Sequence, residues 1–354
     1  MPILPNFLER LIFLRLNQAP GPLLDLFGAV AFRTVLAALR LGLFEALSRG
    51  PMSAEEVARQ IKADERGTTL LLEALEPLGY ISKKGNLYSN TAMTAKWLVR
   101  DSPNSVASGY DFWAEALSQL WQDLEESIRS GRPRMRFYEW LEENPGTLRD
   151  FQMWIIATAR NTIGEIVAKA KLPLTARWLL DVGGGHGLYS IAFCRRYSQL
   201  SATVFDLPGA LKVGREVIEA EKMGDQVKVQ EGDFWSDDLG AGYDVALLFN
   251  IIHAYLPDKN VELLGKVASS LNPGGDIVIL EQLAGKALSP TARAITRIFG
   301  LNYFHLLGGQ IYTFDEIARW LTSSGFTNPR RINLLRSPGV SLVMGTKDSR
   351  HSPH

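Results

Sequence analysis

The sequence predicts an α/β protein whose doubly wound, mostly parallel sheet is preceded by an α-helical, winged-helix-like domain. After residue 173, short apolar strands alternate with helical segments, the pattern of parallel strands joined by crossover helices. Before residue 105, three helical patterns are followed by a β-hairpin pattern, which is the order of elements in a winged helix. A length of 354 residues is enough for about two domains of ordinary size.

The first 50 residues contain two helical patterns, separated by the Pro-Gly-Pro break at 20–22. The second pattern, from Phe32 to Leu47, is apolar on every side. A helix of this kind has to be buried, so we expect it to pack in a core or against another subunit.

Two shorter helices and a hairpin follow. Ser53 and Glu56 form the pattern of a capping box, which predicts a helix that runs to Ile61. A second helix is predicted from Asp64 to a stop at Gly79. The leucines of this helix that we expect to point inward are Leu70, Leu71, Leu72, Leu75 and Leu78. Residues 80–82 and 87–89, joined by a Lys-Lys-Gly-Asn turn, predict the hairpin.

The charge of the second helix bears on whether this region binds DNA. In a DNA-binding winged helix it would approach the phosphates, yet residues 64–78 carry four carboxylates and one arginine. A net charge of −3 disfavours DNA binding, and a winged helix used for dimerisation is the better interpretation. The whole chain is neutral, with 38 basic and 38 acidic residues, which also argues against bulk attraction to nucleic acid or anionic membranes.

The remaining composition excludes several other classes of site. A single cysteine, Cys194, excludes an internal disulfide and thiolate metal clusters, and five histidines make a histidine-rich metal site improbable. The N-terminus does not resemble a cleaved signal peptide, and no run of about 18 apolar residues predicts a transmembrane helix. We therefore expect a cytoplasmic protein without a metal.

Residues 103–170 have a helical pattern rich in aromatic side chains, broken at 131–133. Beyond them, apolar strands are predicted at 178–182, 202–206, 227–231, 243–249 and 276–281. The first strand ends in Gly183-x-Gly185-x-Gly187, one residue tighter than the dinucleotide-binding turn, and glycines there let a backbone pass close to a ligand. Asp206 ends the second strand, where a carboxylate receives two ribose hydroxyls.

The ends of the third and fourth strands add two more features. The third strand ends in Glu231-Gly232-Asp233-Phe234-Trp235, where a carboxylate can accept a hydrogen bond from an adenine amino group and an adjacent aromatic side chain can cover the ring. His253 follows the fourth strand, at the edge where parallel sheets bind ligands. A histidine at this edge is suited to accept a proton from a bound ligand near neutral pH.

With these features in order, the chain resembles class I S-adenosylmethionine-dependent methyltransferases, and most of all the small-molecule O-methyltransferases that include the caffeate and acetylserotonin enzymes. The segments that carry the resemblance are LLDVGGGHGLYS at 179–190, FDLPGAL at 205–211, EGDFW at 231–235, NIIHAYLPD at 250–258, LNPGGDIVILE at 271–281 and YTFDEIARWLTSSGF at 312–326.

The resemblance implies a Rossmann-like methyltransferase domain, a homodimer formed by the N-terminal domain, and S-adenosylmethionine as methyl donor. It implies domains at 1–105 (dimerisation), 106–172 (helical linker and acceptor binding) and 173–348 (catalytic), with a disordered tail at 349–354. His253 matches the catalytic base and Glu281 a carboxylate that orients it. The cofactor-binding residues it implies are Asp181, Gly183, Gly185, Asp206, Leu207, Asp233, Phe234 and Asn250. Candidates for the acceptor pocket are Trp113, Phe151, Trp154, Asn302 and Tyr303.

The chain departs from the family pattern around the base. Ala254 and Tyr255 replace the Asp and Trp after the histidine, Ile311 replaces a second orienting carboxylate, and Phe249 replaces a basic residue. An imidazole with fewer carboxylate partners is a weaker base, which suits a more acidic acceptor or one that needs no deprotonation. Methylation of a thiol, thioether or activated carbon therefore stays open beside O-methylation, as does a ligand-sensing winged-helix regulator. His305 is expected either to add a polar group to the pocket or to pack on a helix.

Overall fold

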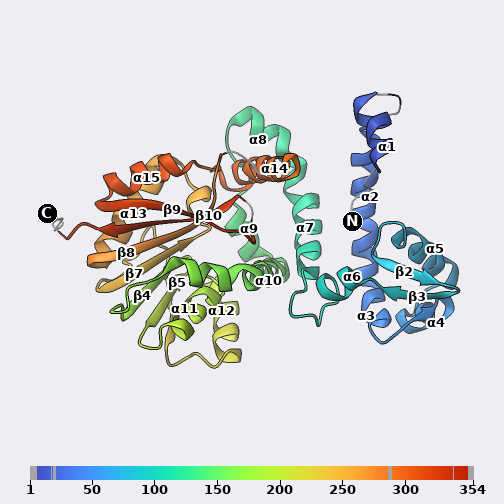
Figure 1. Ribbon diagram of the computed structural model, residues 1–354, viewed down its shortest axis with the longest axis horizontal. Coiled ribbons are helices and arrows are strands. Elements are labelled where there is room, and N and C mark those ends of the chain that lie inside the picture. Colours follow the sequence, from blue (N-terminus) through green and yellow to red (C-terminus); the bar gives the residue numbers. More distant parts are fainter. Residues whose placement is uncertain (1–5, 17, 19–20, 286–288, 338, 350–354) are drawn as a thin grey trace. The chain divides into compact units, whose positions relative to one another are not determined.

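The computed structural model describes residues 6–16, 18, 21–285, 289–337 and 339–349. The chain divides into two compact units, Met1–Ala114 and Glu115–His354, and each is described by itself (Figure 1). Of the tail predicted at 349–354, all but Ser349 lies outside the described residues.

The N-terminal unit has the predicted winged-helix order of elements. Its helices are α1 (Phe7–Arg10), the π-helical η1 (Leu11–Arg15), α2 (Leu23–Arg40), α3 (Leu43–Leu47), α4 (Ala54–Ile61), α5 (Glu65–Leu75), α6 (Ala92–Trp97) and α7 (Ala107–Gln119), of which α7 continues into the second unit. The wing is the hairpin of β2 (Ile81–Lys84) and β3 (Leu87–Asn90). Strand β1 (Met52–Ser53) was not predicted. It pairs with β3 and is an edge strand of this small sheet.

The capping box at the start of α4 forms as predicted. Ser53 Oγ accepts from the Glu56 backbone N–H, the Glu56 carboxylate accepts from the Ser53 N–H, and the helix ends at Ile61. The prediction for α5 was wrong at Leu70, whose side chain is 56% exposed. Leu70 lies next to Leu71 and Leu72 in sequence, and three consecutive residues of a helix cannot all face one core.

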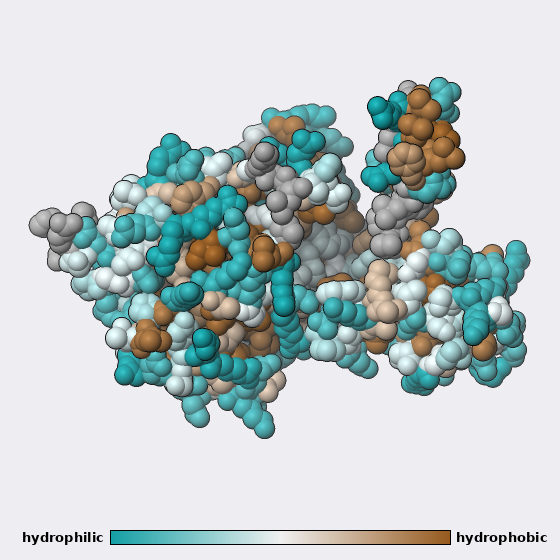
Figure 2. Space-filling model, in the orientation of Figure 1, coloured by the Kyte–Doolittle hydropathy of each residue, from teal (hydrophilic) through white to brown (hydrophobic). Residues whose placement is uncertain are grey.

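Helix α2 is buried over only half its length. Leu36 and Leu39 lie in the core of the unit, whereas Leu23, Leu26, Phe27 and Val30 are exposed. Phe7 and Leu8 of α1 are exposed as well, and Figure 2 shows the apolar surface that this end of the chain presents. The pattern predicted to be buried, Phe32–Leu47, thus packs in the core of the unit, whereas the part of α2 before it presents an apolar face to the outside.

The second unit is a seven-stranded α/β sheet in the order β6-β5-β4-β7-β8-β10-β9. Its strands are β4 (Trp178–Val182), β5 (Ser201–Asp206), β6 (Val227–Glu231), β7 (Tyr243–Phe249), β8 (Leu271–Gln282), β9 (Phe326–Asn333) and β10 (Val340–Lys347). Its helices are η2 (Trp121–Asp123), α8 (Leu124–Ser130), α9 (Phe137–Glu143), α10 (Pro145–Ala170), α11 (Leu188–Arg196), α12 (Pro208–Ala220), η3 (Ile252–Ala254), α13 (Pro257–Ser270), α14 (Pro290–Leu307) and α15 (Phe314–Ser323).

The first five strands of this sheet are parallel, and β10 runs antiparallel between β8 and β9. The predicted doubly wound, mostly parallel fold is therefore confirmed. Strands β9 and β10 were not predicted. β9 is an edge strand with Pro329 and consecutive arginines at 330–331, and such polar edge strands lack the apolar signal of a buried strand.

Two hydrophobic cores lie on opposite faces of the sheet. Neighbouring residues of β4 divide between them, because successive side chains of a strand point to opposite faces: Leu179 joins the core with α10, α11 and α12, and Leu180 joins the core with α13 and α15 (Figure 1). The chain reverses its direction of winding between β4 and β7, and sheets of this type bind ligands outside the carboxyl ends of the strands at that point. No helix within the described ranges is long and apolar enough to cross a membrane.

Candidate active site

The glycine-rich turn joins β4 to α11 at the reversal point. Gly183, Gly185 and Gly187 all have positive φ angles, of +68°, +46° and +69°. A side chain on Gly183 would collide with Ile251, and a Cβ on Gly184 would lie 2.5 Å from the Asp181 carboxyl carbon. The turn therefore needs glycine for both its conformation and its close packing, which leaves its backbone open toward the ligand edge of the sheet.

Asp206 lies against this turn, as its place at the end of β5 predicts. Its Oδ2 accepts from the Gly185 N–H at 2.8 Å, and its Oδ1 accepts from the Leu207 N–H at 2.7 Å. Burial, together with a smaller contribution from the nearby Glu142 carboxylate, raises the pKa of Asp206 to about 6, although the two backbone donors act to lower it. The carboxylate is thus held in one orientation beside the glycine turn.

Asp181 lies beneath the turn and is fully buried. Its Oδ2 accepts from the Ser190 hydroxyl at 2.7 Å, while its Oδ1 has no hydrogen-bond partner. Burial raises the pKa of Asp181 to about 7. Gln152 of α10, which was not predicted, is also buried. Its Oε1 has no hydrogen-bond partner within the described residues and lies 3.5 Å from where a Cβ of Gly185 would be. Two hydrogen-bond acceptors without donors therefore flank the turn.

Residues 233–237, which we call the 233–237 loop, follow β6 on the same edge. Asp233 Oδ1 accepts from the Trp235 N–H at 2.9 Å, so this side chain shapes its own loop. The Phe234 ring lies 3.9 Å from where a Cβ of Gly183 would be, and it meets Trp235 edge to face. The predicted adenine-side residues and the glycine turn are thus neighbours.

Lys266 of α13 anchors this loop, although no sequence motif marks this lysine. Its ammonium group donates to three backbone carbonyls, those of Phe234 at 2.5 Å, Trp235 at 3.2 Å and Asp237 at 3.0 Å. Charge-assisted hydrogen bonds of this kind are about twice as strong as neutral ones. Three of them from one side chain fix the course of the loop.

His253 and Glu281 form a hydrogen-bonded pair beside the turn, on η3 and β8. His253 Nδ1 lies 2.8 Å from Glu281 Oε2, and the His253 backbone N–H donates to Glu281 Oε1 at 3.3 Å. The two residues are 7% and 1% exposed. When the carboxylate is ionised it only accepts, so Nδ1 donates in this contact, and a neutral imidazole then has its free electron pair at Nε2.

Tyr303 of α14 covers one face of this histidine. The two rings are parallel to within 12°, with centroids 3.8 Å apart. After α14, Gly309 packs on the backbone of the same segment, where a Cβ would lie 2.7 Å from the carbonyl carbon of Ala254. Both the ring and the backbone of His253 are therefore confined by this part of the chain.

Tyr138 of α9 was not predicted to belong to the site. Its hydroxyl interacts electrostatically with Tyr255, Asp206, Tyr303 and Glu281, so Tyr138 lies near both the Asp206 side and the His253 side of the site. No motif marks this position, because only the course of α9 brings it there.

The remaining acceptor candidates are more scattered. The Phe151 ring packs edge to face on Phe137 and Trp154. Asn302 is buried, and within the described residues its Oδ1 has no hydrogen-bond partner. Trp113 belongs to the N-terminal unit, where its ring meets Phe112. Tyr303 lies directly on His253.

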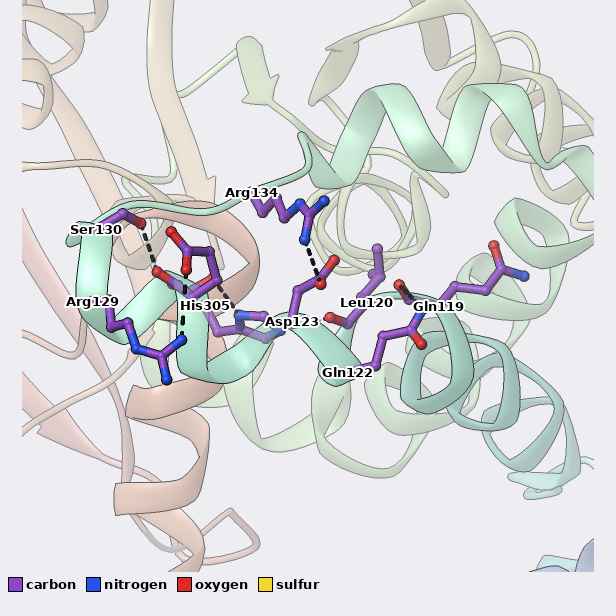
Figure 3. Close-up of polar contacts among 10 residues, drawn as sticks. Gln119, Leu120, Gln122, Asp123, Arg129, Ser130, Arg134 and His305 are labelled. Carbon is purple, nitrogen blue, oxygen red and sulfur yellow. Dashed lines mark hydrogen bonds and ion pairs between the residues drawn. The ribbon is translucent and has the colours of Figure 1, made fainter.

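His305 packs within the helices, which is one of its two expected roles. Its Nε2 lies 3.1 Å from the Leu120 carbonyl oxygen and its Nδ1 lies 2.9 Å from Ser127 Oγ. Because a carbonyl only accepts, Nε2 donates to it, and both ring nitrogens of this buried histidine have a hydrogen-bond partner. Figure 3 shows His305 among the polar contacts of η2 and α8, including the Asp123–Arg134 ion pair.

The replaced family positions are mostly apolar and packed. Phe249 is buried edge to face against Tyr189, and Ala254 is buried in η3. The Ile311 side chain lies 3.7 Å from where a Cβ of Gly300 would be, so it packs on α14.

Asn250, a predicted cofactor residue, has a φ of +58° and donates its N–H to the Leu280 carbonyl. Within the described residues, no three His, Cys, Asp or Glu side chains gather as a metal site.

The chain matches two protein-family models, which together span most of its length. An O-methyltransferase domain matches residues 121–327, and an O-methyltransferase dimerisation domain matches residues 24–101.

Individual proteins that resemble this chain are methyltransferases as well. A 3-hydroxy-5-methyl-1-naphthoate 3-O-methyltransferase of Streptomyces sahachiroi is 29% identical, covering 89% of this chain and 91% of its own. An L-tyrosine C(3)-methyltransferase of Streptomyces lavendulae is 26% identical over 91% of both chains. The crystal structure of human N-acetylserotonin methyltransferase in complex with SAM has the same fold, with a TM-score of 0.78 and 22% identity over 98% of this chain and 100% of that chain. The protein therefore belongs to the O-methyltransferase family, with the family's dimerisation domain at its N-terminal end.

Proposed function

We propose that the protein transfers a methyl group from S-adenosylmethionine to a hydroxyl group of a small aromatic molecule, with His253 as general base. The observation that carries this proposal is the buried His253–Glu281 pair beside a nucleoside-type ligand edge. Family membership supports methyl transfer from S-adenosylmethionine, and the naphthoate enzyme of Streptomyces sahachiroi supports an aromatic hydroxyl as acceptor.

The residues around the glycine turn fit S-adenosylmethionine. Asp206 is held beside the glycine turn, which supports its proposed role in accepting hydrogen bonds from ribose hydroxyls. Phe234 lies near Gly183, which supports the proposal that Asp233 and Phe234 receive the adenine. The unpartnered oxygens of Asp181 and Gln152 suit the ammonium group of the methionine part, which needs hydrogen-bond acceptors. Gly183, Gly185, Leu207 and Asn250 complete the cofactor-binding set that we propose. When bound, the group supplies an electrophilic methyl on a sulfonium sulfur.

The protein's contribution to the reaction is to position the acceptor and to accept its proton. Glu281 holds the Nδ1–H of His253, so the Nε2 electron pair is available for a hydroxyl proton. General-base help of this kind contributes about 10²–10⁴ in rate. The aromatic rings of Phe151, Trp154 and Tyr138, together with Asn302, are the proposed lining for the acceptor, and Trp113 stays a prediction.

C-methylation is the second candidate, and a specific observation favours it. The match to the L-tyrosine C(3)-methyltransferase covers 91% of this chain, against 89% for the naphthoate enzyme. Ile311 also leaves the imidazole with fewer carboxylates than the family pattern provides, which suits an acceptor that is easily deprotonated. S-methylation stays possible on chemical grounds, without a relative among these to support it.

Methyl-¹³C S-adenosylmethionine separates these candidates. The enzyme is incubated with a panel of hydroxynaphthoates, L-tyrosine and thiophenol, and the ¹³C shift of the product methyl identifies the atom that carries it. We expect an O-methyl product from a hydroxynaphthoate. A product methylated only on ring carbon or sulfur would replace the proposal by the corresponding alternative, and no product with any acceptor would contradict it.

We also propose that the chain forms a homodimer through its N-terminal domain. The dimerisation-domain match supports this, as does the exposed apolar surface of α2 at Leu26, Phe27 and Val30. Light scattering of the wild type is expected to give twice the chain mass. Leu26→Glu together with Val30→Glu is expected to give a lower mass, and an unchanged dimer would contradict this location of the interface.

A further inference from the structure

We propose that Tyr303 is a positioning residue for His253, whose ring stacks on the imidazole and holds it in the orientation needed to accept a proton. This inference rests on the proposed role of His253 as general base. Tyr303 was expected from the sequence to line the acceptor pocket, and its contact with His253 assigns it a different task.

One carboxylate alone leaves the imidazole free to turn. Glu281 is the only carboxylate that hydrogen-bonds to His253 within the described residues, and it holds the ring at Nδ1. A single hydrogen bond fixes the tautomer and the Nδ1–Oε2 distance, but small rotations about the Cα–Cβ and Cβ–Cγ bonds can still tilt the ring. Such a rotation swings Nε2 away from the acceptor, and an orientation error of this size is costly in catalysis.

The Tyr303 ring blocks this rotation. Its centroid lies 3.8 Å from that of the imidazole, at an interplanar angle of 12°. Because 3.8 Å is close to van der Waals contact, the imidazole cannot tilt toward that side without a collision. The hydrogen bond to Glu281 and the stack on Tyr303 thus restrain two different motions of one ring.

Tyr303 is itself held in place by its helix. Phe299, one turn earlier on α14, packs against it with centroids 6.1 Å apart. Two residues further along, His305 ties α14 to Ser127 and Leu120 through both ring nitrogens. The ring that covers His253 therefore projects from an anchored helix rather than from a loop.

Ile311 explains why this chain depends on the stack. It stands where the family pattern has a second orienting carboxylate, and its side chain packs on α14 at Gly300. Helix α14, which carries Tyr303, is thus in apolar contact with Ile311, the residue that stands in place of the second carboxylate. A positively charged imidazole, formed when His253 accepts a proton, also gains from the face of an aromatic ring.

Two substitutions at Tyr303 separate positioning from pocket lining. Tyr303→Phe keeps the stacked ring, and we expect its kcat with a hydroxynaphthoate acceptor to stay within about twofold of wild type. Tyr303→Leu removes the ring, and we expect kcat to fall about tenfold while the Kd for S-adenosylhomocysteine by calorimetry is unchanged. In a His253→Ala background, Tyr303→Leu is expected to have no further effect on kcat.

The opposite pattern would overturn the inference. If Tyr303→Leu raises only the KM for the acceptor, or lowers kcat equally in the His253→Ala background, Tyr303 lines the pocket and does not position the base. Unchanged cofactor affinity and an unchanged circular dichroism spectrum show that the variants fold.

A spectroscopic measurement tests the stack even if no hydroxyl acceptor is methylated and the proposed function fails. In protein labelled with ¹³C-histidine, ring current from a stacked tyrosine shifts the His253 Cε1–H resonance upfield. We expect Tyr303→Leu to move it downfield and Tyr303→Phe to leave it in place, with His253→Ala assigning the signal. A resonance that Tyr303→Leu does not move would contradict the stacked geometry.

Discussion

Replacing Glu281 by glutamine tests how the proposed base is oriented. Glu281 is 1% exposed and accepts two hydrogen bonds from His253, one from the ring and one from the backbone. A glutamine oxygen can still accept from the backbone N–H. The neutral amide then presents its NH₂ group to Nδ1, so Nδ1 has to accept and the imidazole proton moves to Nε2. Nε2 is the atom that has to take the hydroxyl proton of the methyl acceptor, so this tautomer cannot act as the base.

The expected loss follows from the hydrogen bond that changes. A hydrogen bond to a charged group is worth about 1.5–3 kcal/mol. Since each 1.36 kcal/mol is a factor of ten in rate, we expect Glu281→Gln to lower kcat by about 10- to 150-fold. The Glu281 carboxylate hydrogen-bonds to His253 and is not part of the proposed cofactor-binding set, so the Kd for S-adenosylhomocysteine is expected to stay the same.

Steady-state methyl transfer and calorimetry measure the two quantities. Glu262→Gln is the matched control, because that glutamate is exposed and pairs with Lys259 on the surface of α13. A Glu281→Gln enzyme whose kcat stays within twofold of the control would refute the reasoning, since Glu281 would then not orient the base.

Three further predictions concern the cofactor edge and the backbone of the base. Lys266→Met removes the donor to three carbonyls of the 233–237 loop, so we expect the Kd for S-adenosylhomocysteine by calorimetry to rise about tenfold, and an unchanged Kd would contradict this anchor. Burial raises the pKa of Asp206 to about 6, and a protonated carboxyl accepts ribose hydroxyls less well. Affinity should therefore fall as the pH drops through about 6 and be constant above it, whereas Asp206→Asn should bind weakly with no such step. Gly309→Ala places a methyl group against the His253–Ala254 backbone, so we expect a lower kcat at unchanged cofactor affinity, and equal kcat would refute that contact.

The sequence predicted those parts of the site that lie at strand ends. Parallel strands bring their carboxyl ends to one edge, so the glycine turn after β4 and Asp206 at the end of β5 were expected to meet, and they do. His253 follows β7, which lies next to β4 in the sheet. Glu281 lies near the end of β8, next to β7 in the sheet, which accounts for its contact with His253. Here a local pattern and the topology rules were sufficient.

Residues that reach the site from helices could not be predicted in this way. Tyr138, Gln152 and Lys266 carry no motif, and their places depend on how α9, α10 and α13 pack, which periodicity does not determine. Tyr303 was selected for the site, but only the structure reveals that it stacks on His253 rather than simply lining a pocket. Polar edge strands such as β9 could not be predicted for a related reason. They are held by backbone hydrogen bonds to the neighbouring strand, and these bonds leave no apolar pattern in the sequence.

The most direct test of the central claim is the single-turnover rate of methyl transfer in wild type and His253→Ala, each saturated with S-adenosylmethionine and mixed with an excess of a hydroxynaphthoate acceptor. We expect an O-methylated product from the wild type and a rate about 10²–10⁴-fold lower from His253→Ala, with equal cofactor affinity in both. Equal rates in the two proteins would show that no proton is taken by His253 in the step that limits transfer, and would contradict the account.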